Sequence, residues 1–171
     1  MLILGIDPGT ATTGYGTVQI LRSGPVAINW GLIETDKKYN PSQRLFQIHL
    51  RMTNLISKYK PDAIAIERIF FATNAKTAIR VGQAQGVMLL AAAGAGTQVF
   101  EYAPGTIKKM ITGNGRADKK MVQKSIREVF GAKVRSKKNK KTHFDNAADA
   151  LAVALCHIYS LNGKARKVQG A

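Results

Sequence analysis

Acidic side chains follow two apolar segments of this sequence, and their positions suggest metal-dependent chemistry. Asp7 directly follows the apolar residues 2–6, and Glu67 directly follows residues 63–66. If both segments are strands of one sheet, the two carboxylates can lie side by side at one edge of it. Carboxylate oxygens are the ligands that Mg²⁺ and Mn²⁺ prefer in proteins. The pair therefore predicts a divalent metal site.

A predicted helix at 143–161 adds further polar groups to this set. Asp145 and Asp149 are four residues apart and share one helix face. Asn146 and His143 lie three and six residues before Asp149, so carboxylate, amide and imidazole can approach one site. A carboxylate in an apolar setting is costly unless it is paired or bound to a metal. Asp149 is in such a setting, surrounded by Ala147, Ala148, Ala150, Leu151 and Ala152.

Simpler explanations exist for each acid taken alone. Asp145 fits an ordinary solvated helix charge, and Asp7 fits a cap on the turn that follows it. Asp7, Glu67 and Asp149 taken together favour a shared metal site, because two metal ions that act on a phosphodiester need three or four converging acids.

The net charge indicates a polyanionic partner. The chain has 26 Lys and Arg against 10 Asp and Glu, a formal charge of +16, and nucleic acid is the leading candidate. A run of charge is usually a solvated face, but residues 103–142 carry thirteen basic and two acidic residues (13 − 2 = 11 net positive charges). We expect the part of this stretch at 133–141 to follow a nucleic-acid backbone.

The length of 171 residues favours one domain. We expect this domain to span residues 1–162 and a basic, disordered tail to span 163–171. The single cysteine, Cys156, excludes an intramolecular disulfide and a cysteine-rich zinc site. The short first apolar run is neither a signal peptide nor a membrane span, so we expect a cytoplasmic protein without a membrane partner.

Strand and helix patterns alternate in the way that is typical of an α/β fold with a mixed sheet. Strands are predicted at 2–7, 14–21, 26–34, 63–67 and 97–102, and helices at 41–60, 74–94, 104–111, 118–130 and 143–161. The first helix is amphipathic, and the apolar residues on or near one face are Leu45, Ile48, Leu50, Met52 and Ile56.

Six short motifs, in this order along the chain, resemble the RuvC family of Holliday-junction resolvases. They are Gly5-Ile6-Asp7-Pro8-Gly9, Ile66-Glu67, Phe70-Phe71, Glu101-Tyr102-Ala103, Ala117-Asp118-Lys119 and residues 147–152. The resemblance implies a ribonuclease-H-like fold, with a mixed five-stranded sheet flanked by helices. It also implies a homodimer that makes paired nicks in four-way junction DNA with two Mg²⁺ ions per site, for which Mn²⁺ can substitute. A branch-migration motor like RuvA and RuvB is the further partner that it implies.

The family's four metal-binding positions fall on Asp7, Glu67, Asn146 and Asp149. Asn146 departs from the family pattern, which has an acid or a histidine there, and its neutral carbonyl weakens the site. This leaves two alternatives. Asp145 or His143 compensates and the chain cuts DNA, or the chain is a junction-binding protein with impaired catalysis.

The resemblance also assigns residues that contact DNA. Lys108 and Lys119 match family lysines near the active site, where a cation can steady the scissile phosphate. Phe70 matches a residue that stacks on an unpaired base, although Phe is more often a core residue. The other expected DNA contacts are Arg68, Phe71, Asn74, Lys76, Arg116 and Lys120.

The turn after Asp7 leaves one further alternative open. An Asp-x-Gly-Thr turn after a first strand also resembles the phosphate loop of actin-like ATPases and sugar kinases. Those proteins enclose a nucleotide between two such domains, and 171 residues are too few for both. The basic charge and the distal acids also fit that alternative poorly.

Overall fold

A five-stranded mixed sheet forms the centre of the computed structural model, which describes residues 1–69, 75–131, 134, 141–161 and 163, without the side chains of 141–145. The strand order is β3-β2-β1-β4-β5. Strands β1 to β3 pair antiparallel, and β1, β4 and β5 pair parallel. Their bounds are β1 (Leu2–Asp7), β2 (Thr12–Leu21), β3 (Gly24–Glu34), β4 (Ala63–Glu67) and β5 (Val99–Tyr102).

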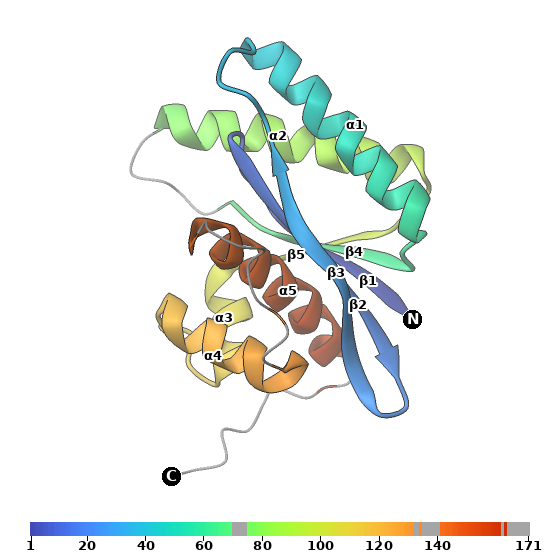
Figure 1. Ribbon diagram of the computed structural model, residues 1–171, viewed down its shortest axis with the longest axis vertical. Coiled ribbons are helices and arrows are strands. Elements are labelled where there is room, and N and C mark those ends of the chain that lie inside the picture. Colours follow the sequence, from blue (N-terminus) through green and yellow to red (C-terminus); the bar gives the residue numbers. More distant parts are fainter. Residues whose placement is uncertain (70–74, 132–133, 135–140, 162, 164–171) are drawn as a thin grey trace.

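Helices cover both faces of the sheet, as the sequence predicts (Figure 1). One face is covered by α1 (Pro41–Tyr59) and α2 (Ala75–Gly94), and the other by α3 (Pro104–Thr112), α4 (Lys119–Phe130) and α5 (Lys141–Leu161). Each face has its own hydrophobic core, and β1 and β4 contribute to both. The predicted α/β class with a mixed five-stranded sheet is confirmed.

Local signals explain the bounds of α1. The Asn40 side chain accepts a hydrogen bond from the Gln43 backbone N–H at 2.9 Å, and the Gln43 side chain accepts one from the Asn40 backbone, which is a capping box. The helix ends at Lys60, in the left-handed conformation (φ 46°). Its buried residues are Ile48, Met52 and Ile56. Leu50 is 42% exposed, so its predicted place beside the buried face is wrong, because it lies about 200° around the helix from Ile48.

Helix α5 lies very close to the sheet because glycines face it. A Cβ on Gly5 of β1 would collide with the backbone oxygen of Ala150 and lie 2.7 Å from the Ala154 nitrogen. A Cβ on Gly14 of β2 would collide with the backbone oxygen of Asn146. These contacts fix the height of α5 above the strands, and with it the positions of the polar groups that α5 carries.

Four predicted starting points differ from the structure by two residues. Strand β2 starts at Thr12, because Thr12 still pairs with Glu34 of β3. Strand β3 starts at Gly24, which pairs with Leu21 across a two-residue turn. Strand β5 starts at Val99 and α5 at Lys141. Thr97 does not belong to the strand, because its N–H donates to the Ala92 oxygen at 3.0 Å and closes the end of α2.

Candidate active site

The ends of β1 and β4 bring the first two predicted acids together. In the parallel pair, Ile6 lies opposite Ile66, so Asp7 and Glu67 are the next residues of the two strands at the same edge of the sheet. Asp7 also pairs with Gly14, and Glu67 with Tyr102. The predicted side-by-side arrangement of the two acids is confirmed.

The turn that follows Asp7 is held by hydrogen bonds from three other elements. The Thr13 hydroxyl donates to the Gly9 oxygen at 2.6 Å. The Thr10 oxygen accepts from the Thr35 hydroxyl at 2.7 Å and from Arg44 Nη2 at 3.2 Å. These bonds limit the movement of the turn and of Asp7. No local pattern in the sequence marks Thr35 or Arg44, because the residue that they contact is 25 and 34 positions away.

Helix α5 carries the remaining predicted metal positions to this edge. The backbone oxygen of Asn146 lies against Gly14, which is the strand partner of Asp7. Asp149 follows three residues later, on the same side of the helix. The side chains of His143 and Asp145 lie outside the described residues, so their predicted compensation for Asn146 stays a prediction.

The three carboxylates share one electrostatic environment. Burial, and then the charges of Glu67 and Asp149, raise the pKa of Asp7 to about 7, while Lys119 lowers it in part. Burial and the charge of Asp149 raise the pKa of Glu67 to about 7, against the opposing effect of Lys108 and Lys119. Burial and like charge both disfavour the ionised form of a carboxyl group. The edge therefore concentrates negative charge within a basic protein.

Two predicted lysines lie at the same place. Glu67, Asp149, Lys108 and Lys119 line one cleft of about 260 Å³, between β4, α3, α4 and α5. Lys119 Nζ is 3.2 Å from Asp149 Oδ2. Asp118, the N-cap of α4, sets the start of that helix by accepting from the Met121 N–H at 2.8 Å, and Lys119 is the first residue of α4.

The donors at this edge suit a hard divalent cation. The carboxyl groups of Asp7 and Glu67 have a raised pKa because they are buried and lie beside other acids, and a bound divalent cation offsets both effects. As they lie, no three His, Cys, Asp or Glu side chains within the described part of the chain form a group that can hold a metal ion. Mutual repulsion and the Lys119–Asp149 ion pair both oppose such a cluster, so the ligand set remains a prediction.

The expected DNA contacts are distributed around the cleft. Arg68 directly follows Glu67 and is exposed, and Lys76 lies in the first turn of α2. Arg116 and Lys120 are exposed on either side of Asp118 at the start of α4. Phe70, Phe71 and Asn74, and most of the basic segment 133–141, lie outside the described residues.

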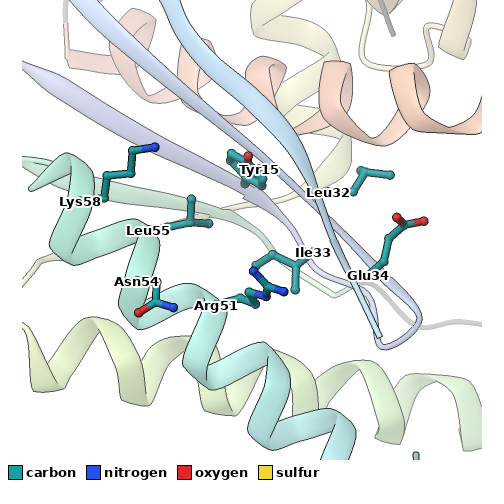
Figure 2. A pocket seen from close by; sticks show the side chains of 8 residues that line it. All are labelled: Tyr15, Leu32, Ile33, Glu34, Arg51, Asn54, Leu55 and Lys58. Carbon is teal, nitrogen blue, oxygen red and sulfur yellow. The ribbon is translucent and has the colours of Figure 1, made fainter. Parts of the chain in front are cut away.

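A second cleft lies elsewhere and has no predicted site residue in its lining. It measures about 390 Å³ and lies between α1 and the strands β2 and β3 (Figure 2). Its lining residues are Tyr15, Leu32, Ile33, Glu34, Arg51, Asn54, Leu55 and Lys58. Of the predicted site residues, Glu67, Lys108, Lys119 and Asp149 line the smaller cleft, and none lines the larger one.

Comparisons with known proteins agree with the resemblance found in the sequence. The model of the family described as crossover junction endodeoxyribonuclease RuvC matches residues 3–157. RuvC of Syntrophomonas wolfei is 44% identical over 160 residues, which cover 94% of this chain and 90% of the relative. RuvC of Alkaliphilus metalliredigens is 46% identical over 160 residues, 94% of each chain. The structure of Thermus thermophilus RuvC in complex with a Holliday junction substrate is similar with a TM-score of 0.83 and 31% identity, covering 97% of this chain and 98% of that one.

Proposed function

This chain belongs to the RuvC family of crossover junction endodeoxyribonucleases, and we propose that it resolves four-way DNA junctions by paired, symmetric nicks during recombination and repair. The observation that carries the proposal is the edge where Asp7 and Glu67 end adjacent parallel strands and share their surroundings with Asp149. Lys108 and Lys119 line the cleft beside them. Acids for a metal and cations for a phosphate at one place fit phosphodiester hydrolysis.

The nuclease is favoured over a protein that only binds junctions. Relatives that are more than 40% identical across most of this chain are endodeoxyribonucleases by name. Asn146 is the feature that supports the alternative, because its amide oxygen is a weaker ligand than a carboxylate. We place Asn146 in the metal set with Asp7, Glu67 and Asp149, and we expect a slower enzyme rather than an inactive one.

Mg²⁺ is the cofactor that the donor set suits best, with Mn²⁺ as a substitute, and we propose two ions per site. When bound, the metal supplies an activated water and stabilises the leaving oxygen. The carboxylates of Asp7, Glu67 and Asp149 would hold the cations and supply the negative charge of the site. Products with 5′-phosphate and 3′-hydroxyl ends follow from direct hydrolysis.

The lysines and the surrounding basic residues act on the DNA itself. Lys108 on α3 and Lys119 on α4 face the acids across the cleft, where their charges can stabilise the scissile phosphate as negative charge develops on it. Outside the cleft, the exposed side chains contact the backbone of the junction arms and give affinity that depends on salt. We assign this role to Arg68, Lys76, Arg116 and Lys120, and we keep Phe70, Phe71 and Asn74 as proposed contacts with the junction centre.

We propose that two copies of the chain assemble through α2. Ile79 and Leu90 of this helix are 63% and 62% exposed, and a Cβ on Gly86 between them would meet no atom within 4 Å. Such a surface of small and apolar residues allows close approach of a second helix, and paired cuts on opposing strands require two sites related by a two-fold axis. A monomer in sizing experiments at micromolar concentration would argue against this dimer.

The remaining partners follow from the substrate. No helix in the part of the chain that the structure describes is long and apolar enough to cross a bilayer. Because the family resemblance implies a branch-migration motor, we propose a RuvA and RuvB-like complex as a partner. We also propose the cytoplasm as the compartment where it meets its DNA.

Cleavage of a labelled, mobile four-way junction in Mg²⁺ and in Mn²⁺ tests the proposal. The chain and its Asn146→Asp variant are compared, and junction binding is measured in parallel in EDTA. We expect both to bind, both to cut, and the variant to cut about tenfold faster, because a charged ligand replaces a neutral one. If only the variant cuts, the binding-only alternative is correct for this chain. If neither binds the junction more tightly than duplex DNA, the resolvase assignment is wrong.

A further inference from the structure

Glu101 of β5 pairs with Ile66 of β4, the residue before Glu67, and makes two side-chain contacts on the side of the sheet that α2 covers. Its Oε1 atom accepts a hydrogen bond from Gln85 Nε2 of α2 at 2.8 Å. Its Oε2 atom lies 3.5 Å from Arg68 Nε. The three side chains come from α2, from β5 and from the residue that follows β4, so they connect one helix to the edge that holds the acids.

Arg68 occupies the position next to a proposed metal ligand. It directly follows Glu67, and its backbone N–H donates to the Tyr102 oxygen at 2.8 Å, so β5 fixes its main chain. Its side chain is 59% exposed, against 33% for Glu101. A guanidinium has five N–H donors, and the contact with Glu101 leaves most of them available to a phosphate group.

Stability alone is a poor explanation for this arrangement. An ion pair at such exposure contributes little to folding. The carboxylate also removes one positive charge from a surface that binds DNA and repels the phosphates there, in a chain with only ten acids. Gln85 is nevertheless only 8% exposed, and its buried amide bonds this carboxylate.

We propose that Glu101 is a positioning residue, which holds the Arg68 guanidinium toward the DNA backbone at the end of β4, and that Gln85 in turn fixes Glu101. This inference rests on the proposed function. Glu101 does not belong to the metal set, since its two oxygens already contact Arg68 and Gln85. The role differs from simple attraction of DNA, because the residue that carries it is negative.

Glu101→Gln removes a negative charge, so the first test distinguishes a positioning role from simple attraction of DNA. In Glu101→Gln, we expect single-turnover cleavage at saturating protein to slow by about tenfold, because a misplaced contact reduces the productive geometry. Junction and duplex affinity at equal salt should stay the same or rise, since a negative charge is lost. Asp36→Asn is the matched control. Asp36 is exposed and pairs with Lys38, so its loss changes charge equally and should leave cleavage unchanged.

A double-mutant cycle tests whether Glu101 acts through Arg68. Arg68→Gln should slow cleavage, and the double variant Arg68→Gln with Glu101→Gln should be no slower than Arg68→Gln alone. Gln85→Met should slow cleavage less than Glu101→Gln, and the two effects should not add. Equal slowing by Glu101→Gln with and without Arg68, or wild-type cleavage by Glu101→Gln, would overturn the proposal.

A binding measurement in EDTA separates this proposal from the proposed nuclease activity. In a set of junctions, one backbone phosphate near the cleavage point is replaced by a neutral methylphosphonate, at a different position in each. The affinity of each junction is compared with that of the unmodified one. We expect one position at which the neutral group weakens binding of the wild-type chain, no such penalty in Arg68→Gln, and a reduced penalty in Glu101→Gln. If the chain does not cut but this pattern holds, only the activity is wrong. If Glu101→Gln keeps the full wild-type penalty, the positioning role is wrong whether or not the chain cuts.

Discussion

The two faces of the sheet are packed with side chains of different size, and only one face carries the site. Against α5, the strands present glycines and the helix presents alanines, so backbone lies almost on backbone. Against α1 and α2, the buried contacts are made mainly by larger side chains, among them Ile48, Met52, Ile64 and Met88. Figure 1 shows the two layers on opposite sides of the strands.

This difference separates two requirements of the fold. Large side chains bury much apolar area and stabilise the protein, and a lost methyl group changes mainly that stability. Small residues in close contact leave little freedom for α5 to shift, so they determine where Asn146 and Asp149 lie relative to Asp7. We therefore expect changes in the close packing of α5 to affect chemistry, and changes in the apolar core under α1 and α2 to affect mainly stability.

The largest effect is expected from a substitution that removes the chemistry of the α5 face and keeps its packing. In Asp7→Asn, cleavage should fall by about 10³-fold or more, because a charged ligand that stabilises the transition state becomes neutral. Junction affinity should change by no more than a few-fold, since it depends on the basic residues. Junction cleavage and binding assays measure both, and a variant that still nicks at the wild-type rate would sink the assignment of Asp7.

A methyl group on the α5 face should affect both stability and chemistry. Gly14→Ala places a Cβ against the Asn146 backbone, with the Asn146 carbonyl carbon only 2.8 Å away. We expect the free energy of unfolding to fall by about 3 kcal/mol and the remaining folded protein to cut poorly. Chemical denaturation and cleavage per folded molecule are the measurements.

Gly94→Ala is the matched control for that change. A Cβ on Gly94, at the end of α2, would meet no atom within 4 Å, so stability should be unchanged or rise by about 0.5 kcal/mol. If Gly14→Ala is as well tolerated as Gly94→Ala, close contact does not position α5.

A smaller effect is expected on the opposite face. Ile56 of α1 is 4% exposed and packs in the hydrophobic core between the sheet and helices α1 and α2. Ile56→Val should lower the free energy of unfolding by about 1 kcal/mol and leave cleavage per folded molecule unchanged. Denaturation and single-turnover cleavage check the two parts. A loss of cleavage beyond the loss of folded protein would contradict the separation of the two faces.

The smallest expected effect is a dependence of stability on pH that arises at the α5 face. The pKa of Asp7 is raised from 3.8 to about 7, so its contribution to stability is fully present below pH 3.8 and is lost as pH rises through 7. Most of this loss falls between these two pKa values, and its last part should lower the Tm in EDTA by about 3 °C between about pH 6.5 and about pH 8.5. The lowered pKa of His157 keeps that group neutral in this window.

Asp7→Asn is the control for the pH effect. Its Tm should fall less over the same window, because the titrating group is absent, while Glu67 retains its own raised pKa. An equal fall in both proteins would show that Asp7 does not titrate near neutral pH.

The sequence was sufficient to predict the strand ends but not the contacts that hold them. Asp7 and Glu67 follow short apolar runs, and parallel pairing then places them together, which is a local signal. The bonds of Arg44 to Thr10 and of Gln85 to Glu101 join residues 34 and 16 positions apart. Such partners depend on where a whole helix lies, and no pattern in the sequence fixes that. The apolar surroundings of Asp149 marked it as a site residue, the resemblance supplied Lys119, and the structure pairs the two.

The close contact of α5 with Gly5 and Gly14 also has an evolutionary consequence. Most positions of a protein tolerate some single substitution with a small effect. These two tolerate none, since even the Cβ of alanine collides with the helix. Their conservation is therefore expected in any lineage that keeps the reaction, although neither residue has a functional group. A directed-evolution experiment that selects for junction cleavage should consequently leave Gly5 and Gly14 unchanged, while Gly94 varies freely.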